Sequence, residues 1–278
     1  MSLNRFLRSL LGTLLLAGCS REIPLVFYES PDGAWRVEKT QMDAWARSLP
    51  GLADAEIKER LDKAYSAADS LSLREDPPRT LEIFASEVAD RFLAAGSPLW
   101  NDHVYELALD REIECRSWLS WGRRSSEYRR WLLNLNRPGY PVSDIWLSCG
   151  GGAPDTLLRK LMPAAPLTVL FIYGQSCSSC ERLVKEISRS GDFREMAAGG
   201  GVQFLSIYTG EDEPEFAARA ASLPSYWQNW FDRERVVFYA GAFDMNRVPS
   251  LYIVDKDANV VLRGARSVRE TVKKLKKL

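Results

Sequence analysis

Cys177 and Cys180 flank two serines in the stretch YGQSCSSC, and this spacing suits three kinds of chemistry. A Cys-x-x-Cys pair can be a redox-active dithiol, half of a zinc site or a structural crosslink. An apolar run at 167–174 (LTVLFIYG) precedes the pair, and Leu183 and Ile187 follow it at helical spacing. The pair is therefore expected at the turn from a buried strand into a helix.

That position favours the redox interpretation. Unpaired backbone N–H groups and the positive end of the helix dipole would stabilise a thiolate at Cys177. Cys180, one turn further in, could attack a mixed disulfide formed at Cys177. Zinc would need a second ligand pair from Cys115 and Cys149, which lack metal-ligand spacing, and the chain has one histidine. A crosslink here closes a short loop and constrains little chain entropy. We expect no metal and no other cofactor.

A proline stands directly before a later predicted strand. Val248 and Pro249 precede the run SLYIVD at 250–255. A proline at a strand start has no N–H to donate, and it takes the cis form at modest energetic cost. The simpler interpretation is a proline that only begins the strand.

The first 19 residues have the composition of a secretion signal. Arg5 and Arg8 precede an apolar run at 10–16 that is too short to span a bilayer. The ending Leu-Ala-Gly-Cys resembles the bacterial lipobox, in which the cysteine, here Cys19, is acylated and becomes the new N-terminus. This resemblance implies a lipid anchor on the periplasmic side of a bacterial cell envelope, where disulfides persist. The balance of 37 basic and 37 acidic residues gives no indication of nucleic-acid binding.

The 278 residues are long enough for two domains, and the hydrophobic pattern changes character near residue 140. Residues 22–139 have a helical period with punctuation suited to four or five helices. Residues 142–278 begin with a predicted hairpin and continue strand, helix, strand, helix, strand, strand, helix. We therefore predict an α+β chain, with an all-α N-terminal domain followed by an α/β domain that has a mixed central sheet.

The combination of strand, CxxC, helix and the later RVPSLYIVDKDANVVLRG resembles the thioredoxin superfamily, nearest to its TlpA and ResA type of extracytoplasmic thiol-disulfide oxidoreductase. The resemblance implies that Cys177 attacks a protein disulfide and Cys180 resolves the intermediate. It also implies that Pro249 is a cis-proline against the sulfurs, with Val248 offering backbone groups to an extended substrate. A membrane-linked reductant would restore the dithiol. SPLWNDHVYELAL, NRPG and VVFYAGAFDMNRVPSLYIVDKDANVVLRGA also resemble bacterial lipoproteins that have a helical domain of unknown function before the redox domain.

The motif departs from thioredoxin at several positions. Thioredoxin has tryptophan before the first cysteine and Gly-Pro inside the pair, whereas this chain has Ser176 and then Ser178-Ser179. Phe171 stands where thioredoxin carries a buried acid, and Glu181 directly follows the motif. Stabilisation of a thiolate is therefore expected to depend mainly on the helix terminus.

Two further features leave alternatives open. Cys115 and Cys149 could form a structural disulfide or remain two buried thiols. Amphipathic spacing predicts that Trp131 packs in the core, while Trp118, Trp121 and Trp146 are the candidates for an aromatic binding groove. The rival function is a redox-idle envelope lipoprotein, whose thioredoxin-like domain is a scaffold and whose tryptophan-rich helices bind a partner or ligand. Seven of the nine tryptophans lie at positions 35, 45, 100, 118, 121, 131 and 146.

Overall fold

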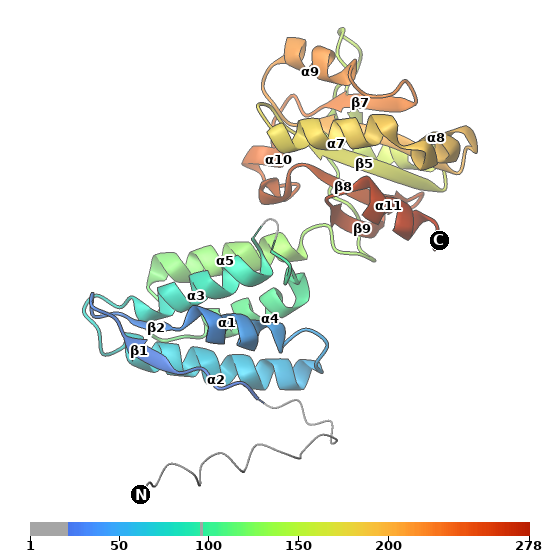
Figure 1. Cartoon of the computed structure of the whole chain (residues 1–278). Helices are drawn as coiled ribbons and strands as arrows, with labels where there is room; N and C mark the ends of the chain where they lie inside the picture. The colour runs from blue at the N-terminus through green and yellow to red at the C-terminus, as the bar shows by residue number, and fades with distance from the viewer. Residues whose placement is uncertain (1–21, 95–96) are drawn as a thin grey trace, which may run out of the picture. The chain divides into compact units, whose positions relative to one another are not determined.

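The computed structural model of the chain describes residues 22–94 and 97–278 (Figure 1). Contacts between Cα atoms divide the chain into two compact units, residues 1–123 and 124–278. The predicted signal segment and Cys19 lie outside the described residues. In the part that is described, no helix combines the length and the hydrophobicity needed to cross a membrane.

The N-terminal unit is mainly helical, as the 3.6-residue period predicted. A two-stranded antiparallel hairpin, which the sequence analysis missed, precedes the helices; its strands are β1 (Phe27–Glu29) and β2 (Trp35–Val37). The helices are α1 (Lys39–Arg47), α2 (Asp54–Ser72), α3 (Thr80–Phe92), α4 (Asp102–Ile113) and the beginning of α5 (Ser120–Asn134). Strands of three residues are too short for an alternating pattern to indicate them.

Aromatic contacts hold the helices of this unit together, and side-chain caps fix where they begin. Tyr65 of α2 meets Phe84 of α3 edge-on, with 5.0 Å between ring centroids, and both side chains are buried. The Asn101 side chain accepts a hydrogen bond from Val104 N and so caps α4. His103 Nε2 lies 2.8 Å from Asp54 Oδ1, which links the first turns of α4 and α2. His103 therefore has a structural role.

The unit boundary lies earlier in the sequence than the predicted change near residue 140. It falls between Arg123 and Arg124, inside α5. Within the C-terminal unit, Leu132 O accepts a hydrogen bond from Arg263, and Asn136 donates one to Ala242 O. The last turns of α5 thus pack with residues far along the chain. Composition and helical period do not reveal such long-range contacts.

The C-terminal unit contains a mixed five-stranded sheet. Its order is β7 (Trp227–Phe231), β6 (Val202–Tyr208), β5 (Leu167–Tyr173), β8 (Ser250–Asp255) and β9 (Val260–Ala265). Strands β5, β6 and β7 are parallel, whereas β5–β8 and β8–β9 are antiparallel. The predicted entry hairpin forms from β3 (Trp146–Leu147) and β4 (Thr156–Leu157). Strand β7, an edge strand that contains Gln228 and Asn229, was not predicted from the sequence.

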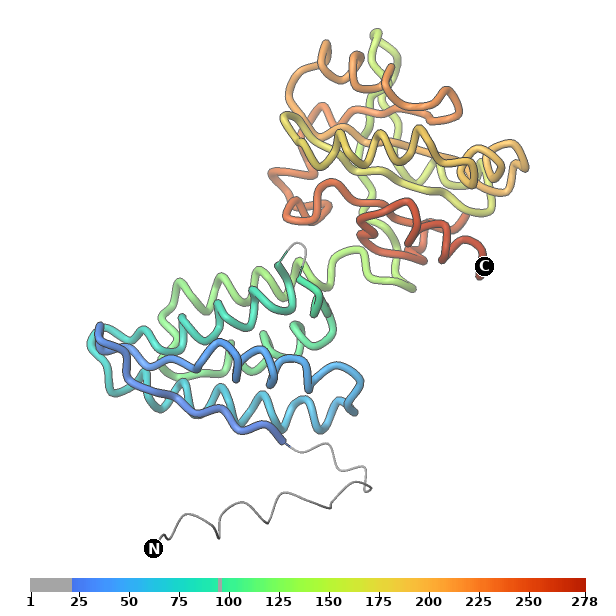
Figure 2. The backbone as a smooth tube through the Cα atoms, in the orientation of Figure 1, coloured from blue at the N-terminus to red at the C-terminus, as the bar shows by residue number. Residues whose placement is uncertain are grey.

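Helices follow the strands in the order that the sequence predicted, with three further short ones. They are α6 (Leu158–Leu161), α7 (Ser178–Arg189), α8 (Gly191–Ala198), α9 (Glu213–Ala220), α10 (Val236–Tyr239) and α11 (Val268–Leu275). Two 3₁₀ turns also occur, η1 (Met162–Ala164) and η2 (Met245–Arg247). Figure 2 follows the backbone from the end of β5 directly into α7.

Both faces of β5 are buried, as its continuous apolar run predicted. Val169, Phe171 and Tyr173 belong to one hydrophobic cluster with side chains from α7, α9 and α11. Leu170 and Ile172 belong to a second cluster with the β3–β4 hairpin and α10. Alternate side chains of β5 thus pack into the two clusters on opposite faces of the sheet. The strand is held on both faces and gives rigid support to the loop that follows it.

Candidate active site

The loop from β5 to α7 positions Cys177. Gly174 follows the strand, and a Cβ atom there would lie 3.3 Å from Thr209 Oγ1 and 3.8 Å from Val248 Cγ1. A residue without a side chain is therefore favoured where these segments meet. Ser176 adopts a φ of 50°, a left-handed conformation, immediately before Cys177. Cys177 itself is the N-cap of α7, as the sequence predicted.

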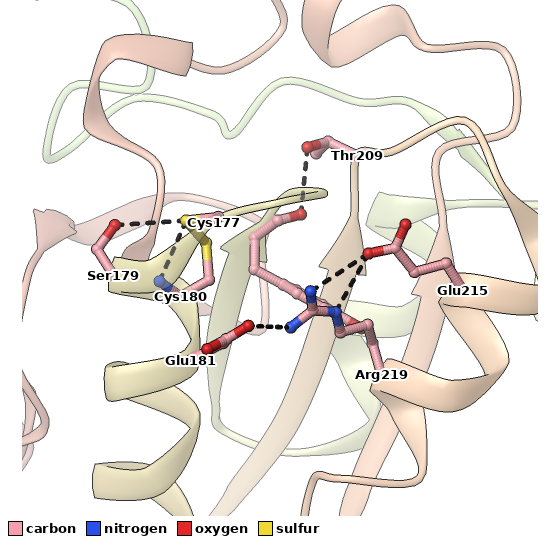
Figure 3. Close-up of a disulfide and its surroundings, with 8 residues drawn as sticks. Cys177, Ser179, Cys180, Glu181, Thr209, Glu215 and Arg219 are labelled. Atoms are coloured by element: carbon pink, nitrogen blue, oxygen red, sulfur yellow. Dashed lines mark hydrogen bonds and ion pairs between the residues drawn. A yellow bond between two sulfur atoms is a disulfide. The ribbon is translucent and has the colours of Figure 1, made fainter.

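Cys177 and Cys180 form a disulfide, with 5.1 Å between their Cα atoms (Figure 3). The two sulfurs differ in exposure. Cys177 is half-buried, whereas Cys180 is 1% exposed and belongs to the hydrophobic cluster beneath α7. An incoming disulfide therefore has access to Cys177 and not to Cys180.

Two donors surround the Cys177 sulfur. Cys177 Sγ accepts a hydrogen bond from Cys180 N at 3.1 Å, which makes it a side-chain cap of the helix. Ser179 Oγ lies 3.3 Å from the same sulfur, and its hydroxyl would donate to a thiolate. Both hydrogen bonds would strengthen if Cys177 were negatively charged. Ser179 is thus a site residue whose contribution the sequence analysis missed.

The Val248–Pro249 peptide bond is cis, as the resemblance implied. Strand register gives its place: Ser250 pairs with Ile172, so Pro249 enters β8 opposite the end of β5, where the chain turns toward Cys177. Val248 and Pro249 are both half-buried. Val248 N donates to Met245 O at 3.2 Å, so the N–H of Val248 is already used inside the chain.

Arg219 is a second feature that sequence reasoning missed. Its guanidinium lies 3.3 Å from Glu181 Oε1 and 3.3 Å from Glu215 Oε1 (Figure 3). Glu181 is the acid in the first turn of α7, and its charge would oppose a thiolate at Cys177. Arg219 offsets that charge from α9. The (i, i+4) spacing of Glu215 and Arg219 could have predicted their ion pair. No local pattern predicts the contact of Arg219 with Glu181.

Aromatic groups fill the place of thioredoxin's buried acid. Phe171 is fully buried and stacks on Tyr173, with 4.8 Å between ring centroids. Burial raises the pKa of Tyr173 to about 12. Both rings share a hydrophobic cluster with Cys180. This apolar surrounding disfavours a charged thiolate at Cys180, so the ionisable sulfur of the reduced pair is expected to be Cys177.

The other two described cysteines are free. Cys115 is buried in the N-terminal unit, and burial raises the pKa of its thiol to about 12. Cys149 is exposed. The disulfide between them, one of the two alternatives from sequence, is not formed, and the expectation of two buried thiols is wrong for Cys149, because it lies in the exposed glycine-rich turn between β3 and β4. Within 22–94 and 97–278, no group of three or more His, Cys, Asp or Glu side chains is arranged to hold a metal.

The structure contradicts one of the two tryptophan predictions, and the aromatic binding groove stays a prediction. Trp131 is 45% exposed and stacks on Tyr128, so the prediction that it packs in the core is wrong. Its ring instead lies close to Gly241, where an added Cβ atom would be 2.8 Å away. Trp118 and Trp121 have ring centroids 6.3 Å apart. Trp146 is exposed and belongs to the other unit.

Comparison with solved structures identifies the fold. A thioredoxin-like protein from Bacteroides caccae matches with a TM-score of 0.73 and 17% identity, covering 86% of this chain and 83% of that one. The C-terminal domain of a Bacteroides fragilis protein matches 51% of this chain over 98% of its own, at 25% identity and a TM-score of 0.47. The thioredoxin domain of a Bacteroides vulgatus thiol-disulfide oxidoreductase covers 50% of this chain and 97% of its own, at 15% identity and a TM-score of 0.42.

No protein-family model and no curated protein sequence matches the chain. Of the three structural matches, the Bacteroides caccae protein has the highest TM-score, and the fold is assigned from that match. Since the C-terminal unit makes up little more than half of the chain, a match over 86% also includes part of the helical unit. The chain has a thioredoxin-like fold, as the sequence resemblance implied.

Proposed function

We propose that the protein is a membrane-anchored, extracytoplasmic thiol-disulfide oxidoreductase that reduces protein disulfides through Cys177 and Cys180. The observation that carries the proposal is the asymmetry of the pair. Cys177 is a half-buried helix cap with two hydrogen-bond donors around its sulfur, whereas Cys180 is buried among apolar side chains. Such asymmetry suits an attacking and a resolving cysteine.

The reaction needs two exchange steps. The Cys177 thiolate attacks one sulfur of the substrate disulfide, forms a mixed disulfide and releases the first substrate thiolate, which takes up a proton. Cys180 then loses its proton and attacks Cys177 Sγ. The Cys177–Cys180 disulfide forms, and the second substrate thiolate leaves. Two electrons have passed to the substrate, and a membrane-linked dithiol reductant must return them. The preference for reduction over oxidation comes from the resemblance to the TlpA and ResA type.

The segment around Pro249 would align the substrate. Because Val248 N–H is bonded to Met245 O, an extended substrate segment would pair with the carbonyl of Val248 rather than with its N–H. The half-buried ring of Pro249 lies beside the turn into the Cys177 loop. A substrate segment that pairs at Val248 would therefore hold its disulfide opposite Cys177 at the helix cap.

Redox titration beside disulfide-reductase activity tests this function. The chain without its first 18 residues is equilibrated in glutathione buffers, and the fraction of Cys177–Cys180 disulfide is measured by mass spectrometry after alkylation. Reduction of a model disulfide protein is followed in parallel. We expect a Cys177→Ser variant to lose this activity and a Cys149→Ser control, at an exposed cysteine outside the pair, to retain it. A Cys177→Ser variant as active as the parent would disprove the catalytic assignment.

Trapping in the native envelope separates this function from the scaffold alternative. A Cys180→Ala variant cannot resolve its mixed disulfides, so it should accumulate covalent adducts with substrate proteins. Adducts that disappear on reduction, and that a Cys177→Ser/Cys180→Ala double variant lacks, would support the oxidoreductase. An empty trap would favour the redox-idle lipoprotein, whose partners bind elsewhere.

A further inference from the structure

A groove with an unusual charge pattern runs between α7 and α11. Its volume is about 1080 Å³, and its sides carry six basic and two acidic residues, the latter being Glu186 and Asp192. We call it the basic groove and define it by its six cations: Arg182, Lys185, Arg189, Arg269, Lys273 and Lys276. Because the whole chain has equal numbers of basic and acidic residues, the groove is a local concentration of positive charge.

Most of these cations have no partner among the residues that the structure describes. Lys276 pairs with Asp192 at 2.6 Å. The other five cations are exposed, and the described residues provide none of them with an ion pair or a side-chain hydrogen bond. Lys185 and Arg189 are four residues apart on α7, as are Arg269 and Lys273 on α11. Like charges at this spacing repel each other and lower helix stability by a few tenths of a kcal/mol per pair.

Helix dipoles explain only part of the pattern. Arg189 and Lys273 lie in the last turns of α7 and α11, where cations are favourable. Arg269, in contrast, is the second residue of α11, next to the positive end of the dipole. Arg182 lies in the N-terminal half of α7. Positive charge at Arg269 opposes the dipole, and Arg182 lies beyond the first turn, where the dipole has little effect. An anionic ligand offers a better explanation of the pattern.

The shape and floor of the basic groove favour a polypeptide ligand. Val268 and Val272 of α11 line it, at 9% and 7% exposure, and give the concave surface an apolar base. Glu186 and Asp192 place negative charge among the cations. A flat anionic lipid surface would not fit this concavity. An amphipathic segment could place acidic side chains on the cations and apolar side chains on the base formed by the two valines.

The basic groove is close to the disulfide along α7, which lies over the sheet with α11 on the same side (Figure 1). Arg182 follows Cys177 by five residues, and Arg189 follows it by twelve. At the rise of an α-helix these positions are about 7 Å and 18 Å from Cys177 along the axis. A segment in the groove could thus belong to the same protein whose disulfide meets Cys177.

We propose that the basic groove docks an acidic, amphipathic segment of the protein substrate, an inference that rests on the proposed oxidoreductase function. Docking would raise the local concentration of the substrate disulfide at Cys177. Substrates with acidic segments would then be reduced faster than neutral ones with the same disulfide.

A binding measurement tests the docking without any redox step. The probe is a fluorescent, cysteine-free helical peptide with glutamate on one face and leucine on the other, and binding is followed by fluorescence anisotropy. We expect the triple variant Arg182→Glu/Lys185→Glu/Lys273→Glu to bind it about tenfold more weakly or worse. A control variant with the same charge change outside the groove, Lys58→Glu/Lys160→Glu/Lys256→Glu, should bind like the parent. Equal binding by the parent and the triple variant, or equal loss in the control, would overturn the proposal.

Two further arms separate the remaining outcomes. Vesicles containing phosphatidylglycerol are tested with the same variants, and groove-dependent binding to vesicles without binding to the peptide would overturn the proposal in favour of a membrane surface. A Cys177→Ser variant should bind the peptide like the parent, because docking needs no sulfur chemistry. If the parent protein binds the peptide but has no reductase activity, the proposed function fails. If the parent has reductase activity but does not bind the peptide through the groove, the docking proposal fails.

Discussion

At the scale of single residues, the Cys177 sulfur lies at a helix cap that can hold a negative charge. Cys180 N and Ser179 Oγ both lie within hydrogen-bonding distance of Cys177 Sγ, and Arg219 offsets the nearby carboxylate of Glu181. Thioredoxin's Gly-Pro cannot provide the hydroxyl group that Ser179 provides here. The two serines of the motif therefore have different roles, since only Ser179 contacts the sulfur.

Removing the Ser179 hydroxyl should make the Cys177 thiolate less stable. A hydrogen bond to a charged group contributes roughly 1.5–3 kcal/mol, so Ser179→Ala should raise the pH of half-ionisation of Cys177 by about one unit or more. Thiolate absorbance of the reduced protein, titrated in a Cys180→Ala background, measures this shift. Ser178→Ala is the matched control and should leave the titration unchanged; an equal shift in both variants would show that Ser179 has no special role.

At the scale of elements, Asp69 ties α2 to the segment that follows α4. Asp69 Oδ1 accepts hydrogen bonds from Ser117 N and Ser117 Oγ at 2.7 Å and 2.6 Å, and Oδ2 accepts one from Arg116 N at 3.0 Å. Burial acts to raise the pKa of Asp69, but these hydrogen bonds outweigh it and the pKa is lowered. The folded state therefore favours the charged carboxylate.

The lowered pKa predicts how a variant should respond to pH. A carboxyl whose pKa is lower in the folded state contributes stability above its unfolded pKa, near 3.9, and this contribution is lost as the pH falls through the folded pKa. Asp69→Asn should thus lower the free energy of unfolding by about 1–3 kcal/mol at pH 7 and by less below pH 4. Urea unfolding at several pH values measures this. Asp90→Asn, at an exposed aspartate of α3, should change little at any pH; a pH-independent loss in Asp69→Asn would contradict the account.

Sequence patterns predicted the elements where burial leaves a clear signature. The residues of β5, which are buried on both faces, form a continuous apolar run, and this run predicted the strand. Short or edge elements, such as the β1–β2 hairpin and β7, carry too few alternating residues to be recognised. For the site, spacing predicted Cys177 and Cys180. Arg219, which depends on α9 lying beside α7, could not be deduced from local sequence.

At the scale of the whole molecule, the two units divide the chain between a helical part and a thioredoxin-like part. The similarity to the Bacteroides caccae structure covers 86% of the chain and so extends over part of both units. The described residues contain no helix that could span a membrane. Attachment to a membrane through Cys19 is a proposal that comes from the lipobox resemblance of the sequence.

Lipidation at Cys19 predicts how the full chain should partition. Expressed with its own first 19 residues in a bacterial host that processes lipoproteins, the chain should enter the detergent phase of a Triton X-114 extraction. A Cys19→Ser variant should remain unacylated and leave that phase, while Cys149→Ser should partition like the parent. Intact mass would show the acyl chains directly. Detergent partitioning that does not depend on Cys19 would refute the anchor.

The most direct test of the central claim is the identity of the attacking sulfur. Reduced Cys180→Ala and Cys177→Ala variants are each mixed with an oxidised model disulfide peptide, and the mixed disulfide is followed by intact mass and located by peptide mapping. Because Cys177 is the accessible, hydrogen-bonded sulfur, we predict that the adduct forms on Cys177 of the Cys180→Ala variant about tenfold faster or more than on Cys180 of the other. Equal rates, or faster adduct formation on Cys180, would contradict the account.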